Sequence, residues 1–179
     1  MVKLIGRYKS TIYGNYRVTG LFYGLIAGVI LSLYVLLLWV FGSPMRAAET
    51  YATDILLTIC VFYMCYRYRE RLPEKRVFFK ELMLLGLWIG VVAAIVYGLW
   101  LWLYGSVIDT EFVDRCIEGR LSVMDLEDES FETHEAIRLT KAYTAGDWGF
   151  IGGFRTAVMS ILMAFMAAIV FKTEKNVRR

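Results

Sequence analysis

Hydrophobic residues along this chain are gathered into four long segments separated by shorter polar ones. The segments at 19–41, 82–104 and 148–171 are strongly apolar, and a fourth at 47–66 is more polar. Because a helix of roughly 20 residues crosses the ~30 Å hydrocarbon core of a bilayer, each segment is long enough to be a transmembrane helix. The pattern therefore predicts an all-α membrane protein, a four-transmembrane-helix bundle whose backbone is helical inside the bilayer.

Composition supports this fold class. Of the 179 residues, 58% are hydrophobic and 16% are aromatic. Such values are typical of membrane proteins and not of soluble domains. Four spans use about half of the chain, so a second soluble domain of ordinary size does not fit. We expect residues 1–179 to form a single membrane domain.

Charge is distributed unevenly between the polar segments, and this predicts the orientation of the bundle. Lysine and arginine are concentrated in both termini and in the 67–80 link, whereas the 105–147 segment carries eleven acidic and four basic residues. Since Lys and Arg mark the cytoplasmic side, we expect cytoplasmic termini, a cytoplasmic 67–80 link and an outer acidic loop at 105–147. The predicted location is a bacterial inner membrane, with the lipid bilayer as surroundings and no nucleic-acid partner.

Small residues recur at every fourth position in three of the segments, and such stripes let helix backbones approach closely in lipid. We expect the stripes of the first and third spans to face each other or a shared bundle axis. A homodimer seam or a docking surface for a partner is the alternative. The predicted helix-packing residues are Gly20, Gly24, Gly28, Gly86, Gly90, Ala94, Gly98, Gly149, Gly153 and Ala157.

The first and third spans share a Gly-Leu-x-x-Gly-Val pattern at an offset of 62 residues. This likeness indicates two helical hairpins in parallel orientation, one made by the first two spans and one by the last two. The loop between the third and fourth spans is too long for a plain connection. Apolar residues at helical spacing after Phe112 and Phe131 predict one or two short amphipathic helices lying over the outer end of the bundle.

Two charged side chains are predicted to lie deepest in the bundle. Asp54 lies about seven residues into the second span from its outer end, and Arg155 about seven residues into the fourth. An unpaired charge at that depth costs at least a few kcal/mol, so we expect the two to pair or to share a water-filled pocket. Glu49 and Thr53 add polar groups nearby. A structural ion pair, a site for a substrate, ion or lipid headgroup, and separate snorkelling of the two charges are the alternatives.

The sequence contains no complete catalytic motif of the kinds found in soluble enzymes. His134-Glu135 begins a zinc-protease motif, but the second histidine is needed at position 138, where the chain has an arginine. With one histidine in the chain, neither a Ser-His-Asp nor a Cys-His arrangement can form. The three cysteines do not have the spacing of a metal or disulfide framework. We therefore expect no enzymatic activity, no catalytic residues, no cofactor and no metal site.

Several short motifs, spread over nearly the whole chain, form a recognisable combination. They are the 23–28 segment that opens the first span, the turn 66–70, the 78–81 and 86–87 stretches, the long polar outer loop, and a glycine-led fourth span that ends at Lys172. The combination resembles a family of small four-span bacterial inner-membrane proteins of unknown function. That family usually has glycine in the turn where this chain has Pro73-Glu74-Lys75. The resemblance implies the four-span topology and brings no established activity or catalytic residues.

Three classes of function fit these features. The first is a non-enzymatic accessory or scaffold subunit of a membrane complex, for example an anchor for a polyprenyl-phosphate glycosyltransferase docked through the basic 67–80 link. The second is a small oligomeric transporter, flippase or channel component, favoured by the hairpin repeat and the two deep charges. The third is an outer-side sensor or regulator that uses the acidic loop. The expected partner is another membrane protein or a second copy of this chain.

Overall fold

The computed structural model of this chain describes residues 15–41, 50–72, 76–122 and 131–172. These residues form six α-helices and one π-helical turn, and no strand occurs within those ranges. The elements are α2 (Tyr16–Val40), α3 (Thr50–Arg71), α4 (Phe79–Leu103), the π-helical turn η3 (Tyr104–Ile108), α5 (Phe112–Leu121), α6 (Phe131–Lys141) and α7 (Ala145–Phe171). The described chain is therefore all-α, as predicted.

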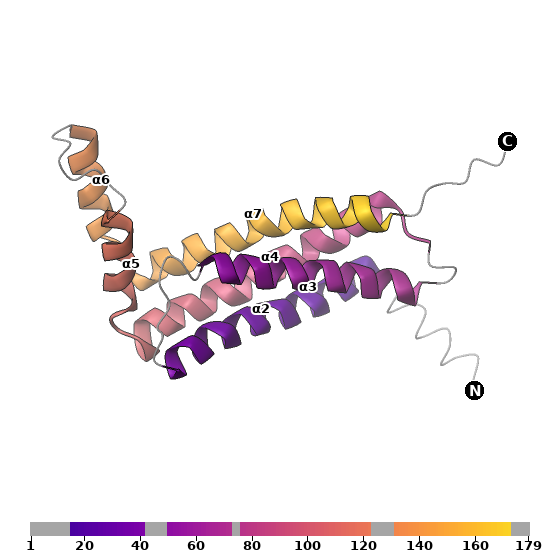
Figure 1. Cartoon of the computed structure of the whole chain (residues 1–179), viewed down its shortest axis with the longest axis horizontal. Coiled ribbons are helices and arrows are strands. Elements are labelled where there is room, and N and C mark those ends of the chain that lie inside the picture. The colour runs from indigo at the N-terminus through magenta and orange to yellow at the C-terminus, as the bar shows by residue number, and fades with distance from the viewer. Residues whose placement is uncertain (1–14, 42–49, 73–75, 123–130, 173–179) are drawn as a thin grey trace.

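The four long helices lie side by side, with α2 and α4 running in one direction and α3 and α7 in the other (Figure 1). The central helix is α4, which packs against α2 and α7, whereas α3 packs mainly against α7. Among the described residues, three helices are long and apolar enough to cross a membrane: α2, α4 together with η3, and α7. Polar residues such as Asp54, Arg69 and Arg71 lower the hydropathy of α3, so the predicted count of four spans depends on this helix.

Three of the long helices begin three residues before the apolar runs that predict them. Polar residues at these helix starts explain the difference. The Asn15 side chain caps α2, and the Phe78 N–H donates to Glu81 Oε2 at 3.3 Å at the start of α4. At the start of α7, Thr144 and Asp147 form a capping box in which the Asp147 N–H donates to Thr144 Oγ1 at 3.4 Å. Such caps extend each helix into polar sequence.

The glycine stripe of α2 lies against a ridge of larger side chains on α4. A Cβ atom at any of these glycines would lie 2.6 Å from a Cβ atom of α4, in the pairs Gly20–Trp88, Gly24–Val92 and Gly28–Val96. Close-packed atoms do not approach to that distance, so this spacing of α2 and α4 requires glycine at all three positions.

The small residues of α4 face α7 instead. A Cβ atom at Gly98 would lie 2.8 Å from the carbonyl oxygen of Gly149, and one at Gly153 would lie 2.9 Å from the carbonyl oxygen of Ala94. Further along the same interface, the close pairs are Gly86–Ala164 and Gly90–Ser160. The expectation that the stripes of α2 and α4 face each other is wrong. The reason is that α4 turns its larger side chains to α2 and its small ones to α7.

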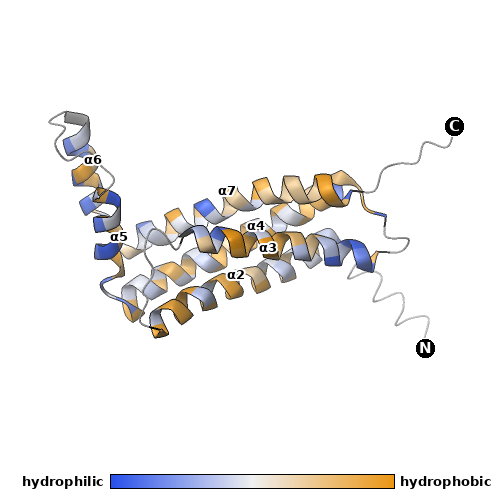
Figure 2. Ribbon diagram, in the orientation of Figure 1, coloured by the Kyte–Doolittle hydropathy of each residue, from blue (hydrophilic) through white to orange (hydrophobic). Residues whose placement is uncertain are grey.

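The helices α5 and α6 form an arm at one end of the bundle, referred to below as the arm. Figure 2 shows hydrophilic residues on the arm and at the ends of the bundle, and apolar residues over the long helices. Short helices therefore occur where the loop sequence predicted them. Figure 1 shows α6 extending past α7, so it does not lie over the end of the bundle. The arm adopts this position because α6 packs against α5, while α5 contacts η3 and α7.

Candidate functional site

The two charged residues predicted to lie deepest come together between α3 and α7. Arg155 Nη2 donates a hydrogen bond to Asp54 Oδ2, and the two side chains form an ion pair. The Asp54 side chain is 17% exposed and the Arg155 side chain is 40% exposed. A half-buried charge among apolar helices is costly unless an opposite charge lies beside it. Each of these residues therefore provides the partner that the other needs.

Side chains from three helices surround this ion pair. The Arg155 guanidinium lies over the Tyr51 ring, with Cζ 5.8 Å from the ring centroid. From α4, the Tyr97 hydroxyl lies close to the Thr53 side chain, though not in hydrogen-bond geometry, and interacts electrostatically with Asp54 and Arg155. Tyr97 is 3% exposed, and within the described ranges its hydroxyl has no partner in hydrogen-bond geometry. Polar groups of α3, α4 and α7 thus converge inside the bundle.

Of the predicted polar site, Asp54, Arg155 and Thr53 lie together, whereas Glu49 lies outside the described residues. Asp54 is about 6 Å along the axis from the start of α3, and Arg155 is about 15 Å from the start of α7, at 1.5 Å of rise per residue. Because the two side chains are level, α3 must begin deeper in the bundle than α7. Figure 1 shows the first turn of α3 set back from the arm end of α4 and α7.

A second polar cluster lies where α4 meets the arm. The Tyr104 hydroxyl donates to Asp109 Oδ2 at 2.6 Å, and Arg115 Nη2 donates to the same oxygen. Tyr104 and Asp109 are buried, and the Phe112 ring packs edge-on against the Tyr104 ring with centroids 5.2 Å apart. A Cβ atom at Gly105 would lie 2.7 Å from Phe112 Cδ1, so glycine is needed there. The cluster attaches α5 to the end of α4.

This cluster was not predicted from the sequence, where Asp109 and Arg115 are two charges of an acidic loop. The available signal was the position of Arg115, a rare basic residue of that loop that directly precedes Cys116 in an apolar stripe. Cys116 is half-buried on α5, and burial raises the pKa of its thiol to about 11. Tyr104, Asp109 and Phe112 are buried as well, so the base of the arm is poorly accessible to solvent.

The other end of the arm has its own contact with the bundle. Arg120 Cζ, near the end of α5, lies 5.4 Å from the centroid of the Tyr143 ring, a cation–π distance. Tyr143 in turn packs edge-on against Trp148 of α7, with centroids 5.7 Å apart. The arm is consequently tied to the end of α4 and to the start of α7.

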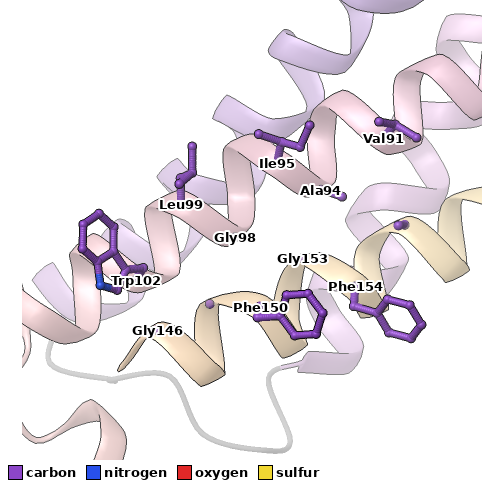
Figure 3. A pocket seen from close by; sticks show the side chains of 12 residues that line it. Val91, Ala94, Ile95, Gly98, Leu99, Trp102, Gly146, Phe150, Gly153 and Phe154 are labelled. Atoms are coloured by element: carbon purple, nitrogen blue, oxygen red, sulfur yellow. The ribbon is translucent and has the colours of Figure 1, made fainter. Parts of the chain in front are cut away.

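An apolar groove with a volume of about 560 Å³ runs along the exposed face between α4 and α7. Figure 3 shows one wall formed by α4 side chains and the other by Phe150 and Phe154 of α7. These two phenylalanines are 75% and 63% exposed, and their rings stack with centroids 6.3 Å apart. The floor consists of predicted helix-packing residues, namely Ala94, Gly98, Gly149, Gly153 and Ala157. The groove is preformed, because its floor is also the interface between the two helices.

Within the described ranges, no group of three or more His, Cys, Asp or Glu residues is placed to hold a metal ion. Both polar clusters pair a carboxylate with a guanidinium.

Comparison with known proteins identifies the family of this chain. Neither the curated proteins nor the solved structures yielded a significant match. The family model described as "Protein of unknown function (DUF4199)" matches residues 22–173, which include nearly all of α2 and the whole of α3, α4, the arm and α7. The resemblance to an uncharacterised family is thereby confirmed. This chain belongs to the DUF4199 family of proteins of unknown function.

Proposed function

We propose that this protein is a non-enzymatic accessory or scaffold subunit of a membrane complex, with four transmembrane helices and the arm on the outer side. Three apolar helices support the membrane location. α3 supports a fourth span, because its 22 residues run antiparallel to α2 and α4 and its Asp54 is neutralised by Arg155. The basic termini and 67–80 link then lie in the cytoplasm of a bacterial inner membrane.

The observation that carries this proposal is the attachment of the arm. The Tyr104–Asp109–Arg115 cluster attaches the start of α5 to the end of α4. The Arg120–Tyr143 contact attaches the end of α5 to the segment that precedes α7. Figure 1 shows α6 extending sideways past α7. The helices of the arm carry four acidic and four basic residues, and the rest of the 105–147 segment carries seven further acidic ones. Anionic headgroups would repel this segment, whereas a neighbouring protein can complement it. We infer that the arm positions a membrane partner beside α7.

The groove between α4 and α7 would take a transmembrane helix of the same partner. One end of the groove reaches Trp102 and Gly146. The next residue, Ala145, lies at the base of the arm, where its Cβ would be 3.3 Å from a Cβ atom at Gly105. The groove and the arm base are thus continuous. Small residues on the groove floor let a partner helix approach closely, which is how helices associate in lipid.

Releasing the arm tests this proposal. Arg115→Gln removes the guanidinium that bonds Asp109, and it is expected to detach α5 from the bundle. The tagged full-length protein is purified from membranes of its own host in mild detergent, and co-purified proteins are quantified by mass spectrometry. We expect a stoichiometric partner with the wild type and about tenfold less of it with Arg115→Gln, the effect of losing about 1.4 kcal/mol of binding free energy.

Arg17→Gln is the matched control, because Arg17 is exposed in the first turn of α2, at the end of the bundle opposite the arm. This variant should retain the partner. A wild-type protein that is stable in native membranes and carries no stoichiometric partner contradicts the proposal.

A small oligomeric transporter, flippase or channel component is the second candidate. The convergence of Asp54, Arg155 and Tyr97 from three helices favours it, because intramembrane polar groups mark substrate and ion pathways. Four spans are few for a monomeric transporter, so two copies would be required. Movement of ions or lipids across vesicles by the purified protein alone would favour this candidate over the first.

A further inference from the structure

The Asp54–Arg155 pair leaves most of its hydrogen-bonding capacity unused. A guanidinium has five N–H donors, and within the described ranges only Nη2 of Arg155 donates, to Asp54 Oδ2. Its other contact there is with the face of the Tyr51 ring. The second carboxylate oxygen, Asp54 Oδ1, has no hydrogen-bond donor among the described residues. The pair thus offers several donors and one acceptor side by side.

Tyr97 adds a polar group that points to a ligand. Tyr97 belongs to α4, and its side chain is buried inside the bundle. Its hydroxyl has no partner in hydrogen-bond geometry within the described part of the chain. The Thr53 side chain lies close to it but not in hydrogen-bond geometry, and Asp54 and Arg155 are its charged neighbours. Buried hydroxyls are normally hydrogen-bonded, because leaving one unpaired costs free energy. A bound molecule that reaches the ion pair would also reach this hydroxyl.

The cluster is placed where a lipid headgroup can enter. Asp54 lies about one helical turn from the start of α3, and this start is set back from the ends of α4 and α7 (Figure 1). Tyr51, in the first turn of α3, is 70% exposed, and 40% of the Arg155 side chain is exposed as well. The donors and the acceptor of the cluster are therefore accessible beside the first turn of α3.

We propose that these groups bind the headgroup of a phospholipid that carries both a phosphate and a primary ammonium group. The pair has no net charge, so a simple anion would be repelled by Asp54 and a simple cation by Arg155. A zwitterionic headgroup complements both: its phosphate accepts hydrogen bonds from Arg155 and Tyr97, and its ammonium donates to Asp54 Oδ1. The Tyr51 ring provides a face on which a cation is stabilised.

The same groups discriminate between zwitterionic headgroups. Asp54 Oδ1 is a hydrogen-bond acceptor, and a primary ammonium brings three N–H donors to it, whereas a trimethylated ammonium brings none. An anionic glycerol headgroup would leave Asp54 facing a second negative charge. The site therefore selects ethanolamine-type lipids over choline-type and glycerol-type lipids. This inference concerns a ligand within the bundle and does not depend on the partner proposed above.

Lipid retention measures the proposal directly. The full-length protein is reconstituted into nanodiscs of phosphatidylethanolamine with phosphatidylglycerol, or of phosphatidylcholine with phosphatidylglycerol in the same ratio. It is then transferred to detergent and examined by native mass spectrometry. We expect one retained ethanolamine lipid, held about tenfold more strongly than the choline lipid, as one hydrogen bond to a charged group provides.

Two tyrosine variants separate the site from general lipid contact. Tyr97→Phe removes only the buried hydroxyl and is expected to lower retention of the ethanolamine lipid about tenfold, again the effect of one such hydrogen bond. Tyr63→Phe changes a tyrosine on α3 that is 60% exposed, and it should leave retention unchanged. Thermal unfolding in choline-lipid nanodiscs verifies that each variant is folded.

The competing outcomes are distinct. Equal retention of the two lipids, or retention that Tyr97→Phe does not change, would overturn the headgroup site. Soluble glycerophosphoethanolamine serves as a competitor: displacement of the retained lipid supports recognition of the headgroup itself. Failure of a large excess to displace it assigns recognition to the acyl chains and contradicts the proposal. A rise in the melting temperature of Tyr97→Phe in both lipids would mean that the hydroxyl has no ligand, which is also contrary to it.

Discussion

α7 is held to its two neighbours in different ways. Towards α4, Gly149 and Gly153 bring the two backbones into direct contact. Towards α3, long side chains span the gap, with Arg155 reaching Asp54 at one end and Phe171 packing on Phe62 at the other, with ring centroids 6.0 Å apart. Backbone contact depends on shape along the whole interface, whereas side-chain contacts form and break one at a time. α4 and α7 are therefore the fixed part of the bundle, and α3 is the adjustable one.

The difference follows from what each helix gains by leaving lipid. An apolar helix gains no hydrophobic free energy from a protein neighbour, since lipid tails are equally apolar, and only close packing holds it. A helix with charged and polar residues gains by burying them against complementary groups. α4 and α7 are apolar and small-residue-rich, whereas α3 carries Asp54 and falls outside the set of apolar helices that could span a membrane. The α4–α7 interface is therefore held by close packing, and the α3–α7 interface by polar and long side chains.

The largest effect is expected from filling the α4–α7 interface. Gly153→Ala places a Cβ atom 2.9 Å from the Ala94 carbonyl oxygen, which is backbone and cannot move aside alone. We expect a loss of about 2 kcal/mol in the free energy of unfolding, as overpacking typically causes. Reversible unfolding in mixed detergent micelles measures it. Gly146→Ala is the control, because its Cβ atom would have no neighbour nearer than 3.5 Å.

A smaller effect is expected at the α3 interface. Asp54→Asn, Arg155→Gln and the double variant form a thermodynamic cycle that isolates the energy of the pair. Because the Arg155 side chain is 40% exposed, solvent screening limits the expected coupling to about 1 kcal/mol. Strictly additive effects would show that the contact contributes nothing. A coupling larger than the loss at Gly153→Ala would reverse the comparison between the two interfaces.

A change in chemical reactivity that leaves stability untouched is expected at the arm, where the close packing of α4 continues through η3 into α5. Burial raises the pKa of the Cys116 thiol from its ordinary value of 9.0 to about 11. Since the thiolate is the reactive form, maleimide labelling at pH 8 should be about 100-fold slower than in the unfolded chain. The rate should continue to rise about tenfold per pH unit up to about pH 11. A plateau near pH 9 would mean that the base of the arm is open.

Much of the fold could be predicted from hydrophobic runs, because the length of an apolar run and the thickness of a bilayer are linked directly. The helix starts were missed by three residues because Asn15, Glu81 and Thr144 are polar and read as parts of links, although they cap helices. Short helices in the long loop were also anticipated from apolar spacing. These features depend on residues that are close together in the sequence, so they can be predicted without a structure.

Pairings between distant residues were harder to predict. The glycine stripes were visible, but their partners depend on how each helix is rotated, and so the ridge from Trp88 to Val96 was not anticipated as the cover of α2. Asp109 was counted among the eleven acidic residues of the outer loop, because nothing local shows that Tyr104 and Arg115 enclose it. Asp54 and Arg155 could be singled out from the sequence because charged residues are rare within apolar runs.

The packing of α2 on α4 has a consequence for biosynthesis. The ridge that covers the glycine face of α2 extends to Val96, which the ribosome adds 68 residues after Gly28. At roughly 5–20 residues per second, translation of that stretch takes about 3 to 14 s. During this interval the glycine face of α2 is open to an insertase, a lipid or α2 of another nascent chain. Slow translation would prolong the competition, so the pace of the ribosome, as well as the stability of the finished bundle, influences how many chains assemble correctly.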